Sequence, residues 1–112
     1  MEHPTIRHED NRRVLVEWVK DLPIRCIKTI FVKDDSPLGN HYHLKKDEVF
    51  YLLKGKGTVI LTTKTNQTRQ WMFEGECIFV PRGTIHTFNL FPDSILLEAA
   101  TEPYDPVDEI RA

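Results

Sequence analysis

Short runs of apolar and β-branched residues recur along most of the chain and are separated by glycine, proline and other turn-forming residues. Apolar runs of this length between such breaks are typical of β-strands and are too short for the helices of a globular protein. We interpret eight runs as strands: residues 13–19, 25–32, 49–53, 58–63, 69–73, 77–80, 85–91 and 94–100. A further strand begins near His41, so the sequence predicts an all-β fold without a long helix.

Three segments depart from this pattern: the two ends of the chain and residues 33–40. Residues 1–11 are polar and charged, and we expect them to form an exposed start. Residues 33–40 contain proline and glycine and are interpreted as a turn. Residues 101–112 carry two prolines and several acids, so we expect a tail that crosses the surface with a short helical turn at its end. The prediction is a single domain over residues 1–112, with a barrel core at about 25–100, an N-terminal strand at 13–19 and a surface tail at 101–112.

The composition is that of an ordinary soluble globular protein. With 40% hydrophobic and 29% charged residues, a chain of 112 residues is long enough for one core. A net charge of -2 and a pI near 6.2 give no basic surface for nucleic acid, and no apolar run reaches the length of a membrane span. No signal-like stretch follows Met1, so we expect a cytoplasmic protein that binds neither membrane nor nucleic acid. Cys26 and Cys77 are then expected to be buried thiols rather than a disulfide.

Three histidines and one glutamate stand near the turns between predicted strands. Side chains at positions i and i+2 of a strand share a face, so His41 and His43 can reach the same ion. Glu48 precedes a buried run, and His86 follows a turn that contains proline and glycine. Each residue alone would be an ordinary surface or rim residue, but imidazoles and a carboxylate together suit Zn, Fe, Mn, Ni, Co or Cu. The sequence therefore predicts one divalent metal ion held by His41, His43, Glu48 and His86.

The spacing of these residues resembles the two motifs of the single-domain cupins. The first motif is a Gly, a His-x-His pair, a Glu and a second Gly; the second motif is a Gly, Pro-x-Gly, a His and an Asn. The matching residues are Gly39, His41, His43, Glu48, Gly55, Gly75, Pro81, Gly83 and His86. Gly39 lies closer to His41 than the family's glycine does, and Asn89 comes one residue early. The resemblance implies a small double-stranded β-helix, the jelly-roll barrel of the cupins, with the metal site inside it.

Alternation along the strands predicts the surroundings of the metal. If Glu48 points inward, Phe50 does so as well, and Phe88 joins His86 on an inner wall. Aromatic side chains around a polar floor are typical of a small-molecule pocket, although they also serve simply to fill a small barrel. Most strand lysines face solvent, but the parity of Lys28 allows it to turn inward, where its ammonium group would bind an anionic ligand.

A second resemblance bears on the substrate. The segment from Leu22 to Arg25, with the strand and the segment Gly39 to Lys45 that follow, is similar to cupins of polysaccharide and nucleotide-sugar pathways, such as sugar ketoisomerases and epimerases. Residues 101–105 are similar to sugar-phosphate isomerase cupins. Many of the nucleotide-sugar enzymes have an arginine where this chain has Leu38, and they work without a metal, through a His and a Tyr. The resemblance implies an isomerase or epimerase that acts on a small oxygen-rich molecule such as a sugar derivative.

Three residues are candidates for moving a proton in such a reaction: Glu48, Tyr42 and Tyr51. Two other functions stay open at this point, because the same open metal positions suit an iron-dependent dioxygenase, and a cupin can also bind a small molecule without catalysis. We also expect a homodimer, since a small barrel leaves strand edges that need to be covered. The strand from Val14 to Trp18 is the candidate to pair with a partner.

Overall fold

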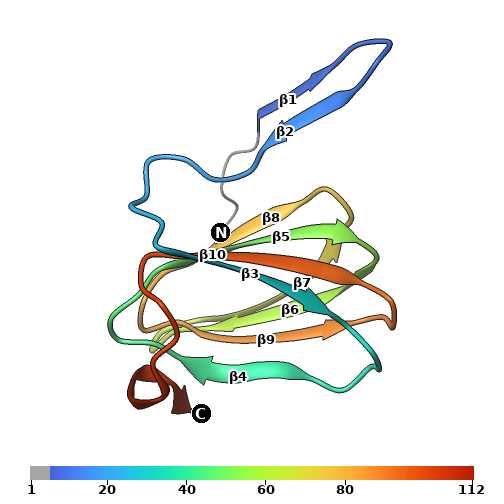
Figure 1. Ribbon diagram of the computed structural model, residues 1–112. Coiled ribbons are helices and arrows are strands. Elements are labelled where there is room, and N and C mark those ends of the chain that lie inside the picture. Colours follow the sequence, from blue (N-terminus) through green and yellow to red (C-terminus); the bar gives the residue numbers. More distant parts are fainter. Residues whose placement is uncertain (1–5) are drawn as a thin grey trace.

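The structure is a computed structural model that describes residues 6–112, and these residues lie mainly in antiparallel strands. Two sheets face each other (Figure 1): a four-stranded sheet in the order β3-β10-β5-β8 and a five-stranded sheet in the order β11-β4-β9-β6-β7. The elements are β1 (Ile6–Glu9), β2 (Val14–Glu17), β3 (Cys26–Phe31), β4 (Leu38–Tyr42), β5 (Glu48–Lys54), β6 (Lys56–Thr62), β7 (Gln67–Phe73), β8 (Cys77–Val80), β9 (Ile85–Leu90), β10 (Ile95–Ala100), the 3₁₀ helix η1 (Pro106–Asp108) and β11 (Ile110–Arg111). This arrangement confirms the predicted all-β jelly-roll fold.

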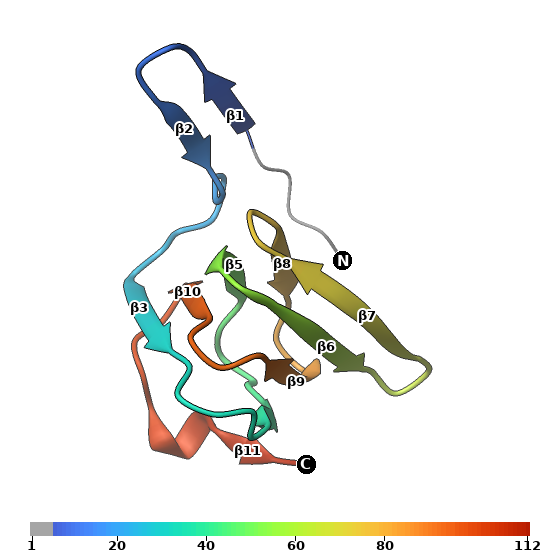
Figure 2. The same ribbon diagram turned by 90° about the vertical axis from the view of Figure 1, so that its right-hand side faces the viewer.

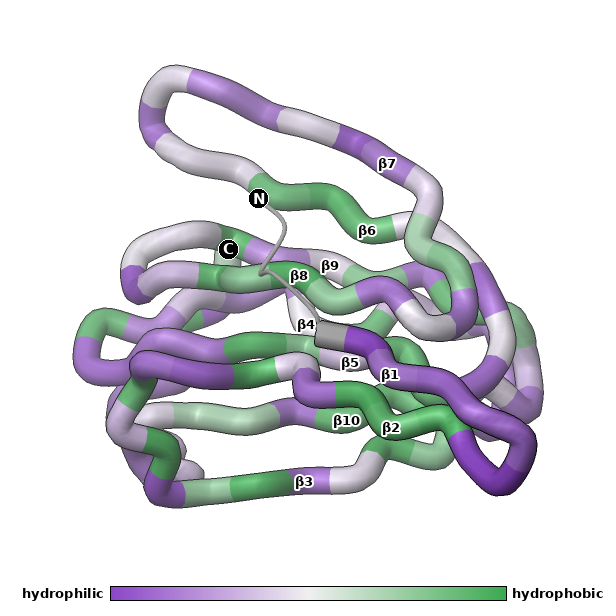
Figure 3. Tube along the Cα trace, turned by 90° about the horizontal axis from the view of Figure 1, so that it is seen from above, coloured by the Kyte–Doolittle hydropathy of each residue, from purple (hydrophilic) through white to green (hydrophobic). Residues whose placement is uncertain are grey.

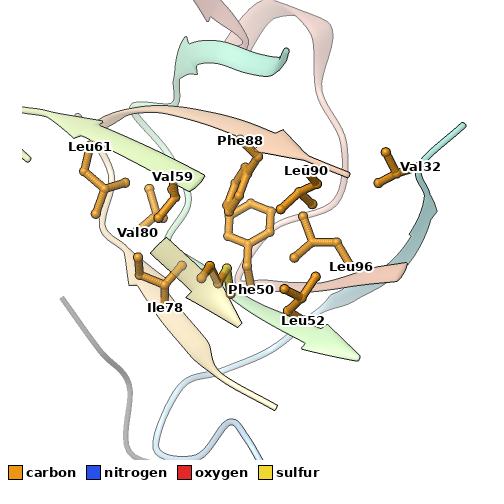
Figure 4. Packing of buried hydrophobic residues seen from close by; sticks show 11 residues of the cluster. Val32, Phe50, Leu52, Val59, Leu61, Ile78, Val80, Phe88, Leu90 and Leu96 are labelled. Atoms are coloured by element: carbon orange, nitrogen blue, oxygen red, sulfur yellow. The ribbon is translucent and has the colours of Figure 1, made fainter. Parts of the chain in front are cut away.

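The core lies between the two sheets and follows the alternation of side chains along the strands. In β6 and β9 every second residue is buried. Figure 4 shows Phe50 of β5 and Phe88 of β9 meeting across the core, with Leu96 of β10 close by. The ring centroids of Phe50 and Phe88 are 4.7 Å apart. Full burial of a side chain of this size contributes about 1.5–3 kcal/mol, so this layer fixes the two sheets on which the site is built.

Strand β4 begins earlier than predicted, because residues 38–40 belong to the strand rather than to a turn. Leu38 and His41 pair with successive inward-facing residues of β9, and the extra residue between them forms a β-bulge. Gly39 and Asn40 have φ angles of 95° and 59°, in the left-handed region that these two residue types enter most easily. The turn-like composition of this segment therefore marks a bulge, which keeps Leu38 and His41 on the same inner face.

The N-terminal segment is a second difference from the sequence prediction. Residues 6–9 form strand β1, which pairs with β2 in a hairpin, whereas residues 1–5 lie outside the described part of the chain. The hairpin extends away from the barrel on the side of the four-stranded sheet (Figures 2 and 3). Val14 and Leu15 in this hairpin are 48% and 46% exposed. Apolar side chains exposed on a projecting hairpin are the kind of surface that a partner covers, but the homodimer stays a prediction.

The C-terminal tail does more than cross the surface. After β10 it passes from the four-stranded to the five-stranded sheet at one end of the barrel, where β11 pairs with β4 (Figure 1). The predicted helical turn is present as η1, and the Asp105 side chain caps it by accepting a hydrogen bond from the Val107 amide. Asp108 is only 5% exposed. The tail therefore contributes side chains to the interior at this end of the barrel.

The two cysteines lie on the two edge strands of the four-stranded sheet, Cys26 in β3 and Cys77 in β8. No disulfide joins them, and strands β10 and β5 lie between their strands. Within residues 6–112 there is no helix with the length and apolar composition needed to span a membrane.

Candidate functional site

Three histidines converge at the end of the barrel where the tail packs. His41 lies on β4, His43 follows directly after that strand, and His86 lies on β9 opposite His41. One nitrogen of each ring lies within 4.8 Å of the corresponding nitrogens of the other two. The ring centroid of His41 is 4.9 Å from that of His43 and 4.7 Å from that of His86. The three imidazoles that the sequence singled out therefore meet at one point.

Close packing of β4 on β9 requires glycine at position 39. A Cβ atom built on Gly39 would lie 2.6 Å from the backbone oxygen of His86, a distance that real Cβ atoms do not adopt. The left-handed φ of this residue disfavours any other side chain as well. Gly39 thus sets the separation of the two strands that carry His41 and His86.

Burial keeps the three histidines neutral. It is the largest cause lowering the pKa of His41 and His43. Burial, followed by the neighbouring His41, lowers the pKa of His86 to about 3. A neutral imidazole carries a lone pair that can bind a metal or accept a proton. At neutral pH this cluster therefore offers three nitrogen lone pairs rather than three positive charges.

Glu48 on β5 faces the histidines from the opposite sheet. Its Oε1 atom lies 3.5 Å from Nε2 of His43 and 3.8 Å from Nε2 of His86. Burial, followed by the charge of Glu98, raises the pKa of Glu48 to about 9, although Lys46 acts in the opposite direction. Even with Lys46 nearby, the carboxyl group is therefore protonated at neutral pH in the absence of a metal ion.

Two buried charged residues that the sequence analysis did not single out complete this cluster. Lys46 is 4% exposed, and its Nζ lies 3.8 Å from Oε2 of Glu48 and 3.8 Å from Oε2 of Glu98. Glu98 on β10 is 6% exposed, and within the described residues its Oε2 makes no hydrogen bond. The position of Glu98 two residues after the buried Leu96 was the available signal, because it places both side chains on the inner face.

The donor set fits a divalent metal. Three neutral imidazoles beside a carboxyl group match the ligand preferences of zinc and of several transition metals. Nδ1 of His41 is buried and makes no hydrogen bond in the described part of the chain, although Oε1 of Glu109 lies 3.4 Å from it. The metal itself stays a prediction.

A cavity of about 80 Å³ opens beside the histidines. Its lining consists of Ile30, Leu38, Gly39, His41, Phe50, His86, Phe88, Leu96 and Glu98. Phe50 and Phe88 face it as alternation predicts, and the ring centroid of His86 lies 5.6 Å from that of Phe50 and 6.1 Å from that of Phe88. Imidazoles and a carboxylate thus meet an apolar wall in one small space.

Lys28 lies on the inner side of β3, the orientation that its parity allows, although most strand lysines face solvent. It pairs across the strands with Glu98, and its Nζ lies 3.8 Å from Oε2 of that residue. The same ammonium group lies 5.3 Å from the centroid of the Tyr104 ring. With 35% of its side chain exposed, Lys28 stands at the rim between the buried cluster and solvent.

The two tyrosines expected to move protons do not join the cluster. Tyr51 comes three residues after Glu48 on β5, so it points to the outer face of the sheet, where Trp18 stacks on its ring at 5.4 Å. Tyr42 directly follows His41 on β4 and has the opposite side-chain direction, next to its β11 partner Ile110. Strand alternation therefore corrects both expectations and leaves Glu48 as the one of the three candidates inside the barrel.

Comparison with known proteins gives a relative and a set of similar structures. A protein of Aquifex aeolicus strain VF5, itself uncharacterised, is 35% identical over 72 residues, which are 63% of this chain. The chain matches only 56% of the length of that relative. The 3,4-ketoisomerase from Helicobacter canadensis superimposes with a TM-score of 0.89 at 21% identity, covering 100% of this chain and 90% of that one.

Two further structures extend this likeness. The WlaRB TDP-quinovose 3,4-ketoisomerase from Campylobacter jejuni has a TM-score of 0.91 at 23% identity and covers 100% of this chain and 92% of its own. The capsular polysaccharide assembling protein CapF from Staphylococcus aureus has a TM-score of 0.70 at 22% identity over 96% of this chain and 34% of its own. At these identities the likeness establishes the fold. The model of the polysaccharide biosynthesis C-terminal domain matches residues 8–94, and this chain therefore belongs to that family.

Proposed function

We propose that this chain is a metal-dependent isomerase of sugar derivatives whose site is the histidine cluster at the end of the barrel. One observation carries the proposal: three neutral imidazoles have donor nitrogens within 4.8 Å of one another, and two of them, His41 and His86, line a cavity that also contains the carboxylate of Glu98. The family of the chain and the ketoisomerases among the similar structures support a sugar as substrate.

The metal would be held by His41, His43, His86 and Glu48. When bound, a divalent ion supplies positive charge that polarises substrate oxygens and stabilises the negative charge developing on them. Three imidazoles and one carboxylate leave about two positions of an octahedral ion for such oxygens. Glu48 would then be ionised, because the cation favours its charged form.

Isomerisation of a keto sugar requires that a base take the proton from the hydroxyl-bearing carbon next to the carbonyl and that a proton be added to the former carbonyl carbon. The hydroxyl proton moves from one oxygen to the other, so that the carbonyl and the hydroxyl group exchange places. Glu98 is the carboxylate best placed to move the carbon-bound proton, because it lines the same cavity as His41 and His86. Its buried Oε2 makes no hydrogen bond among residues 6–112, so a lone pair is available. Lys28 and Lys46, each 3.8 Å from this oxygen, hold the side chain in place.

The inner cavity receives only the reacting end of a substrate. At about 80 Å³ it is smaller than the roughly 300–1,000 Å³ of pockets that enclose whole ligands. A larger hollow of about 520 Å³ lies beside the tail and is lined by Lys45, Glu102, Pro103, Tyr104, Asp105 and Asp108. Lys28 contacts both Glu98 of the inner cavity and Tyr104 of the hollow. The rest of the substrate would occupy this outer hollow, with Phe50 and Phe88 bounding the reacting end.

The test uses TDP-4-keto-6-deoxyglucose, the compound bound in the structure of a similar ketoisomerase, QdtA from Thermoanaerobacterium thermosaccharolyticum. The protein is incubated with this compound in D₂O with and without added divalent metal, and proton NMR follows deuterium entry at C3 and formation of the 3-keto isomer. We expect exchange in the wild type and its loss in Glu98→Gln. Binding of the compound without any exchange or isomer, at every metal tested, would contradict isomerisation and favour a binding role for the barrel.

A further inference from the structure

The C-terminal tail packs directly against two of the three histidines. Nδ1 of His43 lies 2.8 Å from the backbone oxygen of Asp108, and the contact is buried. Nδ1 of His41 lies 3.4 Å from Oε1 of Glu109, the next residue. These tail residues follow the histidines by more than 60 positions and lie outside both cupin-like motifs. The tail therefore reaches the outer side of the histidine cluster.

Asp108 is anchored where it touches the cluster. Its side chain accepts hydrogen bonds from the backbone amides of Leu44 at 2.8 Å and Lys45 at 3.1 Å. These are the two residues that follow His43, so the carboxylate fixes both the tail and the loop that carries the histidine. Carboxylates accepting backbone amide bonds form strong, charge-assisted contacts. The backbone oxygen of Asp108 is thus held rigidly beside His43.

The contact with Asp108 fixes which nitrogen of His43 carries the proton. A carbonyl oxygen can only accept, so Nδ1 of His43 is the protonated nitrogen and Nε2 has the lone pair. That Nε2 faces the site, 3.5 Å from Oε1 of Glu48. His86 repeats the pattern, with Nδ1 3.5 Å from the backbone oxygen of Thr84 and Nε2 3.8 Å from Glu48. In His41 the oxygen facing Nδ1 is Oε1 of Glu109 at 3.4 Å, an ion-pair contact that lacks the geometry of a hydrogen bond.

We propose that Asp108 and Glu109 are positioning residues of the site, and that they hold His43 and His41 as the tautomers whose Nε2 lone pairs face its centre. The inference rests on the proposed function, because it assigns those lone pairs to a metal. Outer partners of this kind orient metal-binding histidines, and their loss typically weakens metal binding about 10–100-fold. The tail is then part of the site rather than a surface appendage.

The experiment compares the full-length wild type with Glu109→Gln, Asp108→Ala and Asp108→Asn, using Val107→Ala as the control. Val107 is in the same tail and is 82% exposed. Long-range ¹H–¹⁵N spectra of histidine-labelled, metal-free protein report the tautomers, and titration with Co²⁺ alone, followed by its visible absorption, reports affinity. We expect Nδ1-protonated His43 in the wild type and the control. We also expect Co²⁺ binding about 10–100-fold weaker in Glu109→Gln and Asp108→Ala, with partial recovery in Asp108→Asn.

The two readouts separate this inference from the metal proposal. If the wild type shows the expected tautomers but binds no Co²⁺, the metal proposal fails and the role of the tail in orienting the rings holds. If the wild type binds Co²⁺ and both Glu109→Gln and Asp108→Ala bind it within twofold of wild type, the inference is overturned. A wild-type His43 protonated on Nε2 would overturn it as well. Glu109→Gln keeps the Asp108 anchor, so it tests the proposal without loosening the tail.

Discussion

Replacing Glu48 with Gln removes a carboxyl group whose pKa burial raises far above its ordinary value. In the metal-free protein, desolvation and the charge of Glu98 raise the pKa of Glu48 from 4.5 to about 9. The folded state therefore keeps a proton that the unfolded state releases above pH 4.5. This group contributes its full stability below about pH 4.5 and loses it as the pH rises towards 9.

The size of the effect follows from these two pKa values. Each pH unit between them changes the free energy of unfolding by about 1.36 kcal/mol per proton. At pH 7 this group has therefore lost roughly 3 kcal/mol of the stabilisation that it supplied below pH 4.5, whereas Glu48→Gln has no proton to release there. The variant should be only slightly different from wild type at pH 5 and more stable by up to about 3 kcal/mol at pH 7. The histidines titrate in both proteins and cancel in the comparison.

The assay is urea unfolding of both proteins in EDTA at pH 5, 6, 7 and 8, with Asp35→Asn as a control that removes an exposed carboxylate. The stability of wild type relative to Glu48→Gln should fall steadily over this range, and the control should run parallel to wild type. Parallel pH profiles for wild type and Glu48→Gln would refute the reasoning, because they would show that Glu48 is ionised in both states. Saturating metal should reverse the order, since a cation stabilises the ionised carboxylate of the wild type.

Three other outcomes can be checked by routine measurements. Gly39→Ala should lower the free energy of unfolding by about 2–4 kcal/mol in urea titrations, because the added Cβ would lie 2.6 Å from the backbone oxygen of His86 and the backbone φ is left-handed. A loss below about 1 kcal/mol would contradict this packing. His86 acts in the opposite direction to Glu48, because its pKa is lowered to about 3 and it must gain a proton on unfolding below about pH 6.5. In thermal melts of the metal-free proteins, the stability of wild type relative to His86→Asn should therefore fall as the pH falls from about 6.5 towards 3, and parallel profiles would contradict this. Light scattering should return the mass of a dimer at micromolar concentrations, and Leu15→Lys on the projecting hairpin should shift it towards monomer; a wild-type monomer mass would refute the homodimer.

The strands of the barrel and the convergence of the three histidines could be predicted because their signals are local. Apolar runs between turns gave the strands, and the i, i+2 spacing of His41 and His43 gave their shared face. The same alternation places Tyr51 on the face of β5 opposite to that of Glu48. The apolar run of β5 is continuous, however, so its sequence alone does not distinguish the inner face from the outer face. β5 is buried on both sides, by the core and by the segment after β2.

The contacts of the tail could not be predicted from the sequence. Asp108 and Glu109 reach the histidines only because β11 pairs with β4, and a strand of two residues has no recognisable pattern. An acidic tail normally indicates a solvated surface. The burial of Lys46 could not be predicted for a related reason, since a lysine in a turn usually faces water. Here its ammonium group lies between the carboxyl groups of Glu48 and Glu98, which come from different strands.

The most direct test of the central claim is the metal content of purified protein after stripping with EDTA and reloading with Zn²⁺, Mn²⁺ or Fe²⁺, in wild type and in the double variant His41→Ala/His43→Ala. The account predicts one metal ion per chain for wild type with at least one of these ions, and a stoichiometry near zero for the variant, because two of the three converging imidazoles are gone. Equal, stoichiometric metal in both proteins, or no metal in either, would contradict it.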